Sequence, residues 1–125
     1  MPSTSRESAS QVEDMGLMEG RYERLEGYTV GFETFREDAD ATPLFKGLPD
    51  DRCQSPHWGY VFKGKVTFRY ADRDEVYETG DAYYAPPGHV PVVSAGTEIV
   101  EFSPTEEYGR TMEVVERNLA AMQPG

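Results

Sequence analysis

The segment "CQSPHWGYVFKG", residues 53–64, decides how the middle of this chain folds. Its pattern predicts a strand that enters a core, yet it carries the single cysteine of the chain and one of its two histidines. Side chains of an extended chain alternate between faces, so Cys53, His57 and Val61 share one face. The opposite face carries an aromatic row: Trp58, Tyr60 and Phe62. One face of the predicted strand therefore presents two good soft metal ligands.

Short strand-like runs surround this segment on both sides. They are expected at 57–63, 65–70, 75–79 and 82–85, with further strands within 27–35 and 97–102. Tight turns separate them, and the polar, proline-containing stretch 36–51 is predicted to be a long surface loop. Many short strands at close spacing are typical of an all-β sandwich or barrel.

The two ends of the chain differ from this middle part. Residues 1–17 are rich in Ser, Glu and Asp, which predicts a flexible N-terminal arm before a single domain at 18–125. At the other end, apolar residues recur at helical spacing and predict a helix over about 104–122. Ser103 and Glu106 have the spacing of a capping box, with Pro104 at the first helical position.

The glycines and prolines between residues 51 and 95 resemble the two sequence motifs of the cupin superfamily. With Gly64 as the last glycine of the first motif, G-x5-H-x-H-x3-E-x6-G, the ligand positions fall on Asp51, Cys53 and His57. The second motif, G-x5-P-x-G-x2-H-x3-N, matches at Gly80, Pro86 and Gly88, but Pro91 occupies its His position and Ala95 its Asn position. The resemblance implies a double-stranded β-helix, the jelly-roll cupin barrel, over about 28–103.

The same resemblance implies a metal site with altered ligands. We expect Cys53, His57 and His89 to form it, with Asp51 or water completing the shell. Mixed sulfur and nitrogen ligands favour zinc or iron as the divalent metal. The alternative is structural: Cys53 would be a small buried hydrophobe, His57 would only form hydrogen bonds in the lumen, and His89 would lie in an exposed turn.

Other polar side chains of the strands are candidates for proton transfer. Glu101, between Val100 and Phe102, is a lumen carboxylate that acts as a base, or else a residue of the outer face. Tyr60, Tyr84 and the adjacent Tyr83 are candidate proton donors to a ligand, although strand tyrosines more often serve packing.

Composition limits the partners of this protein. The 23 acidic and 12 basic side chains give a formal charge of −11, which disfavours nucleic acid and anionic membrane surfaces. A single cysteine allows no internal disulfide, and no apolar run is long enough for a membrane span, so we expect a cytoplasmic protein. The outward aromatic row needs a cover, which the C-terminal helix, the N-terminal arm or a second subunit would supply, and we expect a homodimer.

Two functions are compatible with these features. The first is a small metal-dependent cupin enzyme that acts on a small organic molecule inside the barrel, by isomerase, lyase or oxygenase chemistry. The second is a non-catalytic cupin without metal that binds a small ligand or acts as a sensor. A fold alone does not choose between them.

Overall fold

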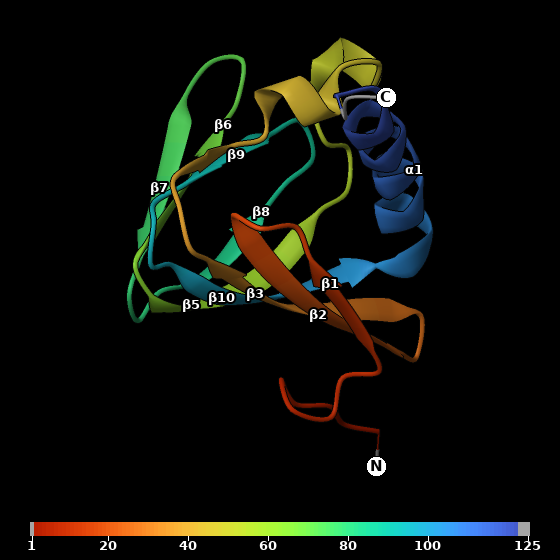
Figure 1. The fold of residues 1–125 in the computed structure, drawn as a ribbon. Helices are drawn as coiled ribbons and strands as arrows, with labels where there is room; N and C mark the ends of the chain where they lie inside the picture. The colour runs from red at the N-terminus through yellow and green to blue at the C-terminus, as the bar shows by residue number, and fades with distance from the viewer. Residues whose placement is uncertain (1, 123–125) are drawn as a thin grey trace.

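The computed structural model describes residues 2–122, which form two antiparallel sheets and one C-terminal helix (Figure 1). The elements in chain order are β1 (Gln11–Asp14), β2 (Met18–Leu25), β3 (Tyr28–Phe35), β4 (Ala39–Asp40), β5 (His57–Lys63), β6 (Lys65–Arg69), β7 (Asp74–Glu78), β8 (Ala82–Ala85), β9 (Val90–Val93), β10 (Glu98–Pro104) and α1 (Thr105–Met122). Two short 3₁₀ turns, Thr42–Phe45 and Pro49–Asp51, lie between β4 and β5. The predicted all-β jelly roll with a C-terminal helix is confirmed.

The two sheets have a jelly-roll topology, because strands distant in sequence lie side by side. The larger sheet has the order β1-β2-β3-β10-β5-β8 and the smaller one the order β4-β9-β6-β7. Every strand predicted from the sequence is present, and most strand ends lie within one residue of the expected position. Sequence reasoning missed β1, β2, β4 and β9, and the predicted loop 36–51 contains β4 and both 3₁₀ turns.

Strand β5 has the side-chain orientation that its alternation predicts. Val61 is fully buried between the sheets and His57 is buried, whereas Trp58, Tyr60 and Phe62 are exposed on the outer face. The inner side chains of both sheets form the main core, which consists of Met18, Phe35, Val61, Val66, Phe68, Tyr70, Tyr83, Ala85, Val93 and Ile99. This orientation places the Cys/His face toward the lumen.

Helix α1 closes one end of the space between the sheets (Figure 1). Its buried Val115 joins Phe45, Leu48, Cys53 and Val90 in a second apolar cluster. Asn118 donates hydrogen bonds to the carbonyl oxygens of Leu44 and Lys46, which holds the helix on the first 3₁₀ turn. The helix begins at Thr105, one residue after the expected start.

The predicted capping box at this helix is wrong. Ser103 belongs to β10, and its Oγ forms a 2.7 Å hydrogen bond with Nδ1 of His57. The Ser103 hydroxyl therefore binds a buried ring in place of a backbone amide at the helix N-terminus.

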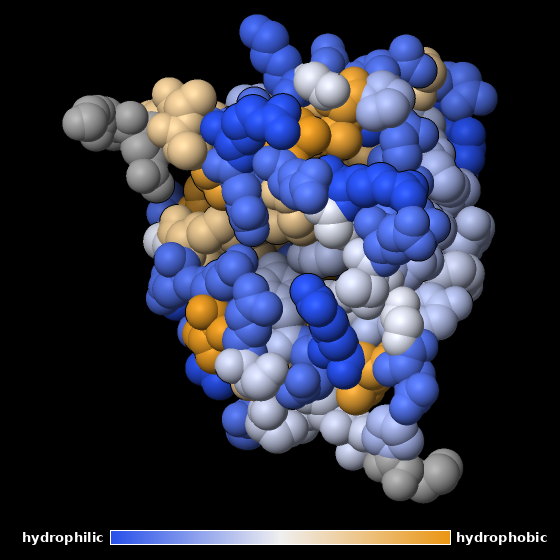
Figure 2. All heavy atoms as spheres, turned by 90° about the vertical axis from the view of Figure 1, so that its right-hand side faces the viewer, coloured by the Kyte–Doolittle hydropathy of each residue, from blue (hydrophilic) through white to orange (hydrophobic). Residues whose placement is uncertain are grey.

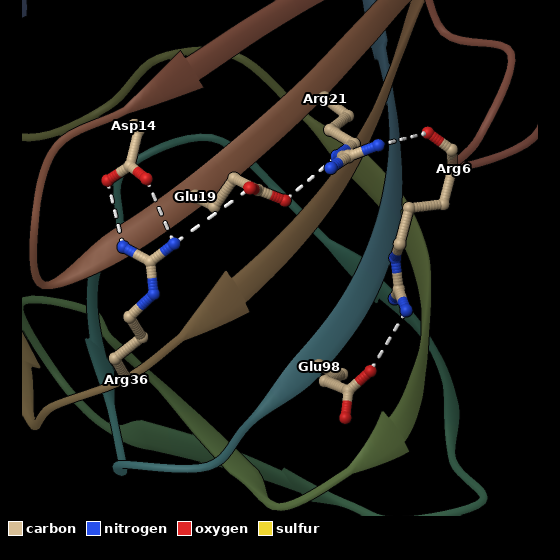
Figure 3. Close-up of polar contacts among 6 residues, drawn as sticks. All are labelled: Arg6, Asp14, Glu19, Arg21, Arg36 and Glu98. Carbon is tan, nitrogen blue, oxygen red and sulfur yellow. Dashed lines mark hydrogen bonds and ion pairs between the residues drawn. The ribbon is translucent and has the colours of Figure 1, made fainter.

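Residues 11–14 belong to the larger sheet rather than to a free arm. They form β1 and pair with β2. Figure 3 shows the polar contacts around them: Arg36 binds Asp14 at 2.8 Å and approaches Glu19 at 3.8 Å. Arg6 pairs with Glu98 of β10 at 3.0 Å, so the chain before β1 also contacts the barrel. Sequence reasoning missed this because residues 11–14 are mostly polar and exposed.

The face that carries α1 is mostly hydrophilic, with only scattered apolar patches (Figure 2). The 23 acidic side chains outnumber the 12 basic ones in the sequence, which is consistent with this surface. Across the described residues, no helix has the length and apolar character needed to cross a membrane.

Candidate functional site

A cavity of about 300 Å³ lies between the two sheets and beneath α1. Most of its lining is apolar, from side chains of both sheets and of the helix, such as Phe35, Val66, Ile99 and Leu119. Its polar lining includes Cys53, His57, His89, Glu33 and Glu101. A pocket with apolar walls and a few convergent polar groups is the usual form of a small-molecule site.

The backbone brings Cys53 next to His89, although 36 positions separate them in sequence. The two residues form an isolated antiparallel bridge, in which the Cys53 amide donates to the His89 carbonyl oxygen at 2.9 Å. Gly88, with a φ of 98°, turns the chain just before His89, and its amide donates to the Cys53 carbonyl oxygen at 2.7 Å. A side chain at Gly88 would be strained in this left-handed conformation.

His57 completes a group of three buried metal-ligand side chains. One donor atom from each of Cys53, His57 and His89 lies within 4.8 Å of the other two. Cys53 Sγ lies 3.8 Å from His57 Nε2, and the two imidazole rings are 4.8 Å apart between centroids. The structure thus brings together the three residues expected to form the site, and His89 is fully buried rather than in an exposed turn.

A hydrogen bond at Nδ1 orients each of the two imidazole rings. His89 Nδ1 lies 2.8 Å from the carbonyl oxygen of Pro86, and because a carbonyl oxygen only accepts, Nδ1 carries the proton. The lone pair is then on Nε2, which is buried without a hydrogen-bond partner. His57 Nδ1 is held by Ser103, which leaves its Nε2 toward Cys53. Rings held at one nitrogen and open at the other are typical of metal-binding histidines.

Burial keeps the three groups uncharged without a metal. It lowers the pKa of His57 to about 4, and burial together with the neighbouring His57 lowers the pKa of His89 to about 3. Burial also raises the pKa of the Cys53 thiol. Neutral imidazoles are ready to bind a metal, whereas Cys53 would have to lose its proton on binding.

The donor set fits zinc or iron. Ligands at about 2.3 Å for sulfur and 2.0–2.1 Å for nitrogen around a tetrahedral ion are about 3.6 Å apart, close to the Cys53–His57 distance. The unpartnered His89 Nε2 is the third donor. Three protein donors beside a cavity leave a position for water or substrate, as in catalytic zinc sites.

Asp51 is not part of this group, contrary to the sequence expectation. It has a φ of 56° in the second 3₁₀ turn, is exposed, and accepts a hydrogen bond from the Gly47 amide at 3.0 Å. The chain is therefore not extended at Asp51, so the alternation that put it on the face of Cys53 does not apply.

The structure assigns the strand tyrosines differently from the sequence expectation. Tyr60 and Tyr84 are both exposed on the outer face, so neither reaches the lumen as a proton donor. Tyr83 is the inward tyrosine of β8, and its hydroxyl donates to Glu101 Oε1 at 2.6 Å. Glu101 does line the cavity, and its pKa is raised above the usual carboxyl range by burial.

Sequence reasoning missed Glu33 and Tyr22. Glu33 lines the same cavity, and Tyr22 donates to its Oε2 at 2.8 Å. An available signal was the alternation of β3, where Glu33 has the parity of Thr29 and Gly31. Tyr22 had no such signal, because β2 was not recognised.

The fold was compared with known proteins. No protein-family model matches the chain, and no curated protein matches it in sequence. Among solved structures, a protein of unknown function from Rhizobium leguminosarum is 16% identical, with a TM-score of 0.60, covering 82% of this chain and 95% of that one. The polyketide cyclase RemF from Streptomyces resistomycificus is 14% identical, with a TM-score of 0.56 and coverages of 83% and 79%.

A third similar structure is a cupin. An RmlC-like cupin from Shewanella frigidimarina is 18% identical, with a TM-score of 0.54, covering 81% of this chain and 88% of that one. These identities are low, so the similarity concerns the arrangement of strands and not the chemistry of the lumen. With two antiparallel sheets that enclose a lumen lined by Cys53, His57 and His89, this chain has the fold of the small single-domain cupins.

Proposed function

We propose that this protein is a small metal-dependent cupin enzyme that acts on a small organic molecule in the lumen. The observation that carries the proposal is the buried, unpartnered Nε2 of His89, next to His57 and Cys53. A buried imidazole nitrogen without a partner is costly, and a bound metal would satisfy it. RemF, a polyketide cyclase, shows that a protein of similar architecture can be an enzyme.

Cys53, His57 and His89 would hold the metal. When bound, zinc or ferrous iron supplies a Lewis acid that polarises an oxygen atom of a substrate. Ser103 and the Pro86 carbonyl group fix the two imidazole rings, so their open nitrogens stay in place.

Glu101 is the candidate group for moving a proton. Burial raises the pKa of this carboxyl group toward neutrality, which suits a general acid or base. Tyr83 binds one carboxyl oxygen and keeps the side chain directed along the inner face. Mostly apolar side chains line the rest of the lumen. Isomerase, lyase and oxygenase reactions all remain compatible with these residues.

Elemental analysis tests the metal proposal. We expect wild-type protein reconstituted with zinc or ferrous iron, then desalted, to retain about one metal per chain. Cys53→Ala, His57→Ala and His89→Ala should each cut that content several-fold. Asp51→Asn is the matched control and should retain the wild-type content, because its carboxylate binds the Gly47 amide instead.

Two results would count against the metal. One is less than about a tenth of a metal per wild-type chain after reconstitution. The other is full metal content in all three alanine variants. Either result would favour the second function, a metal-free cupin that binds a small ligand, for which the apolar cavity is already sufficient.

A further inference from the structure

We propose that the lumen selects uncharged, largely apolar molecules that carry a hydroxyl or a similar hydrogen-bond donor, and that it excludes carboxylates and phosphates. The carboxyl groups of Glu33 and Glu101 accept the hydrogen bond from such a molecule. This inference extends the proposed function by naming a substrate class. It shares with that function only the position of the ligand in the lumen and needs no metal.

The register of two central strands brings the carboxyl groups together. On the pairing of β3 with β10, Glu33 lies opposite Ile99 and Glu101 lies opposite Gly31. The two glutamates are therefore diagonal neighbours on one face, a separation of about 7–8 Å that long side chains can bridge. Both line the cavity.

A tyrosine holds each carboxyl group by one oxygen. Tyr22 donates to Glu33 Oε2 at 2.8 Å, and Tyr83 donates to Glu101 Oε1 at 2.6 Å. Within residues 2–122, no protein group donates a hydrogen bond to Glu33 Oε1 or to Glu101 Oε2, so each oxygen can accept one from a ligand. The tyrosines thus orient the pair while leaving acceptor capacity for a ligand.

Glycines make room for this arrangement. A Cβ at Gly31 would lie 2.8 Å from the Tyr22 ring, and a Cβ at Gly59 would come closer still to the Tyr83 ring. Both tyrosines therefore lie over strand positions that lack side chains. The carboxyl–tyrosine pairs are parts of a site built into the sheet and do not result from chance contacts at a surface.

An independent observation points to a ligand in this cavity. His89 is fully buried and lines the same space, and its Nε2 accepts no hydrogen bond. Together with the free oxygens of Glu33 and Glu101, it makes the polar lining rich in acceptors. Whatever occupies the lumen must bring donors, or a metal ion, to meet them.

The charge of the lining sets the class of ligand. Its ionisable carboxyl groups are those of Glu33, Asp38, Asp40 and Glu101, and no Lys or Arg of the described chain lines the cavity. In the metal-free lumen an anionic ligand would find no cation and would be repelled. Burial raises the pKa of both carboxyl groups, and the charge of Glu101 raises the pKa of Glu33 further. The pair therefore already disfavours a second negative charge nearby, whether on the other carboxyl group or on a ligand.

Three naphthalene probes of similar shape test the proposal on the full chain treated with a chelator. 2-Naphthol carries a donor, 2-methoxynaphthalene lacks it, and 2-naphthoate is an anion. At pH 7.5, calorimetry should show 2-naphthol binding at least about tenfold more tightly than either of the others, because one hydrogen bond to a charged acceptor is worth that much. In Glu33→Gln/Glu101→Gln, the preference for 2-naphthol over 2-naphthoate should fall below about threefold.

Matched variants separate this result from other effects. Glu98→Gln/Glu106→Gln removes the same formal charge outside the cavity lining and should keep the wild-type preference. Glu101→Gln alone should lower the preference if the double variant does not fold. Glu33→Gln/Glu101→Gln should still retain metal after reconstitution, because neither carboxyl group belongs to the Cys53, His57 and His89 group, so loss of the metal site and loss of this selectivity are separate outcomes.

Three outcomes would overturn the proposal. The first is 2-naphthoate binding to wild type as tightly as 2-naphthol. The second is an unchanged preference for 2-naphthol over 2-naphthoate in both Glu101→Gln and Glu33→Gln/Glu101→Gln. The third is no detectable binding of 2-naphthol to a folded wild-type chain.

Discussion

At the scale of single residues, the lumen contains two groups of ionisable side chains whose pKa values are shifted in opposite directions. Burial lowers the pKa of His57 and His89, so these groups resist protonation. Burial raises the pKa of Glu33 and Glu101, so these groups resist ionisation. Both effects have one cause, which is that an apolar enclosure disfavours the charged form of any group.

The carboxyl pair should make stability depend on pH. Burial raises the pKa of Glu101 to about 7 from the ordinary carboxyl value of 4.5, so between these values the folded state binds more protons than the unfolded state. This contribution to stability is complete below pH 4.5 and is lost as pH rises through about 7. The facing tyrosines, Tyr22, Tyr83 and Tyr108, have raised pKa values and stay protonated throughout.

Urea unfolding at pH 5.5 and 7.5 measures this effect. His57 and His89 act in the opposite direction over part of the range, so the informative quantity is wild type compared with Glu101→Gln. Relative to that variant, wild type should lose on the order of 1 kcal/mol more of its unfolding free energy between the two pH values. An equal change in both proteins would mean that Glu101 ionises normally in the folded state.

At the scale of the elements, the site depends on how β5, β8 and β10 pack against one another. Gly59 of β5 pairs with both Tyr83 and Glu101 on the neighbouring strands. The Tyr83 ring lies across Gly59, and Tyr83 binds Glu101. Tyr83 can therefore hold Glu101 in this position only because residue 59 has no side chain.

Gly59→Ala should destabilise the protein. Its Cβ would lie 2.4 Å from Tyr83 Cζ and 2.7 Å from the Val100 carbonyl oxygen, so a ring and a backbone group would both have to move. Overpacking of this kind costs about 1–3 kcal/mol, measured by denaturant unfolding. Gly109→Ala is the opposite control: its Cβ meets nothing within 4 Å. At this helix position alanine should add about 0.5–1 kcal/mol. A Gly59→Ala variant as stable as wild type would show that Tyr83 is not held against the strand.

At the scale of the whole molecule, the outer face of the larger sheet is unusually aromatic. Trp58, Tyr60, Phe62, Tyr84 and Phe102 are each between 40% and 46% exposed. Several of these rings contact one another, as Trp58 does Tyr84 with centroids 5.0 Å apart. Helix α1 lies away from this face, whereas the chain before β1 passes below the larger sheet and reaches β10 through the Arg6–Glu98 pair (Figure 1). The homodimer expected from the sequence stays a prediction, with this face as its interface.

Sedimentation analysis of wild type and Trp58→Glu tests the dimer. We expect wild type to sediment at twice the mass of the chain and Trp58→Glu as a monomer, because a charge in an apolar interface is strongly unfavourable. Val76→Glu, at an exposed apolar residue of the smaller sheet, should remain dimeric. Trp58 is the single tryptophan, so its emission should shift to longer wavelength on dilution. A monomeric wild type at micromolar concentration would refute the dimer.

Local sequence patterns determined the class of fold and one wall of the lumen. Alternation along residues 57–63 was sufficient to direct His57 and Val61 inward and Trp58 outward, because side chains of a strand can only alternate. The positive φ at Gly64, Gly80 and Gly88 follows from turns that other residues adopt with strain. These are short-range constraints, which a single sequence contains in full.

Only the tertiary structure decided which polar groups meet. Glu33 reaches Glu101 through the register of β3 on β10, and Ser103 binds His57 instead of capping α1. Asp51 leaves the metal group because the backbone turns there, and Tyr83 rather than Tyr84 enters the lumen because of the register of β8 on β5. Each of these outcomes depends on contacts between segments distant in sequence. Their free energies are set by packing and burial of the whole chain, which no local pattern records.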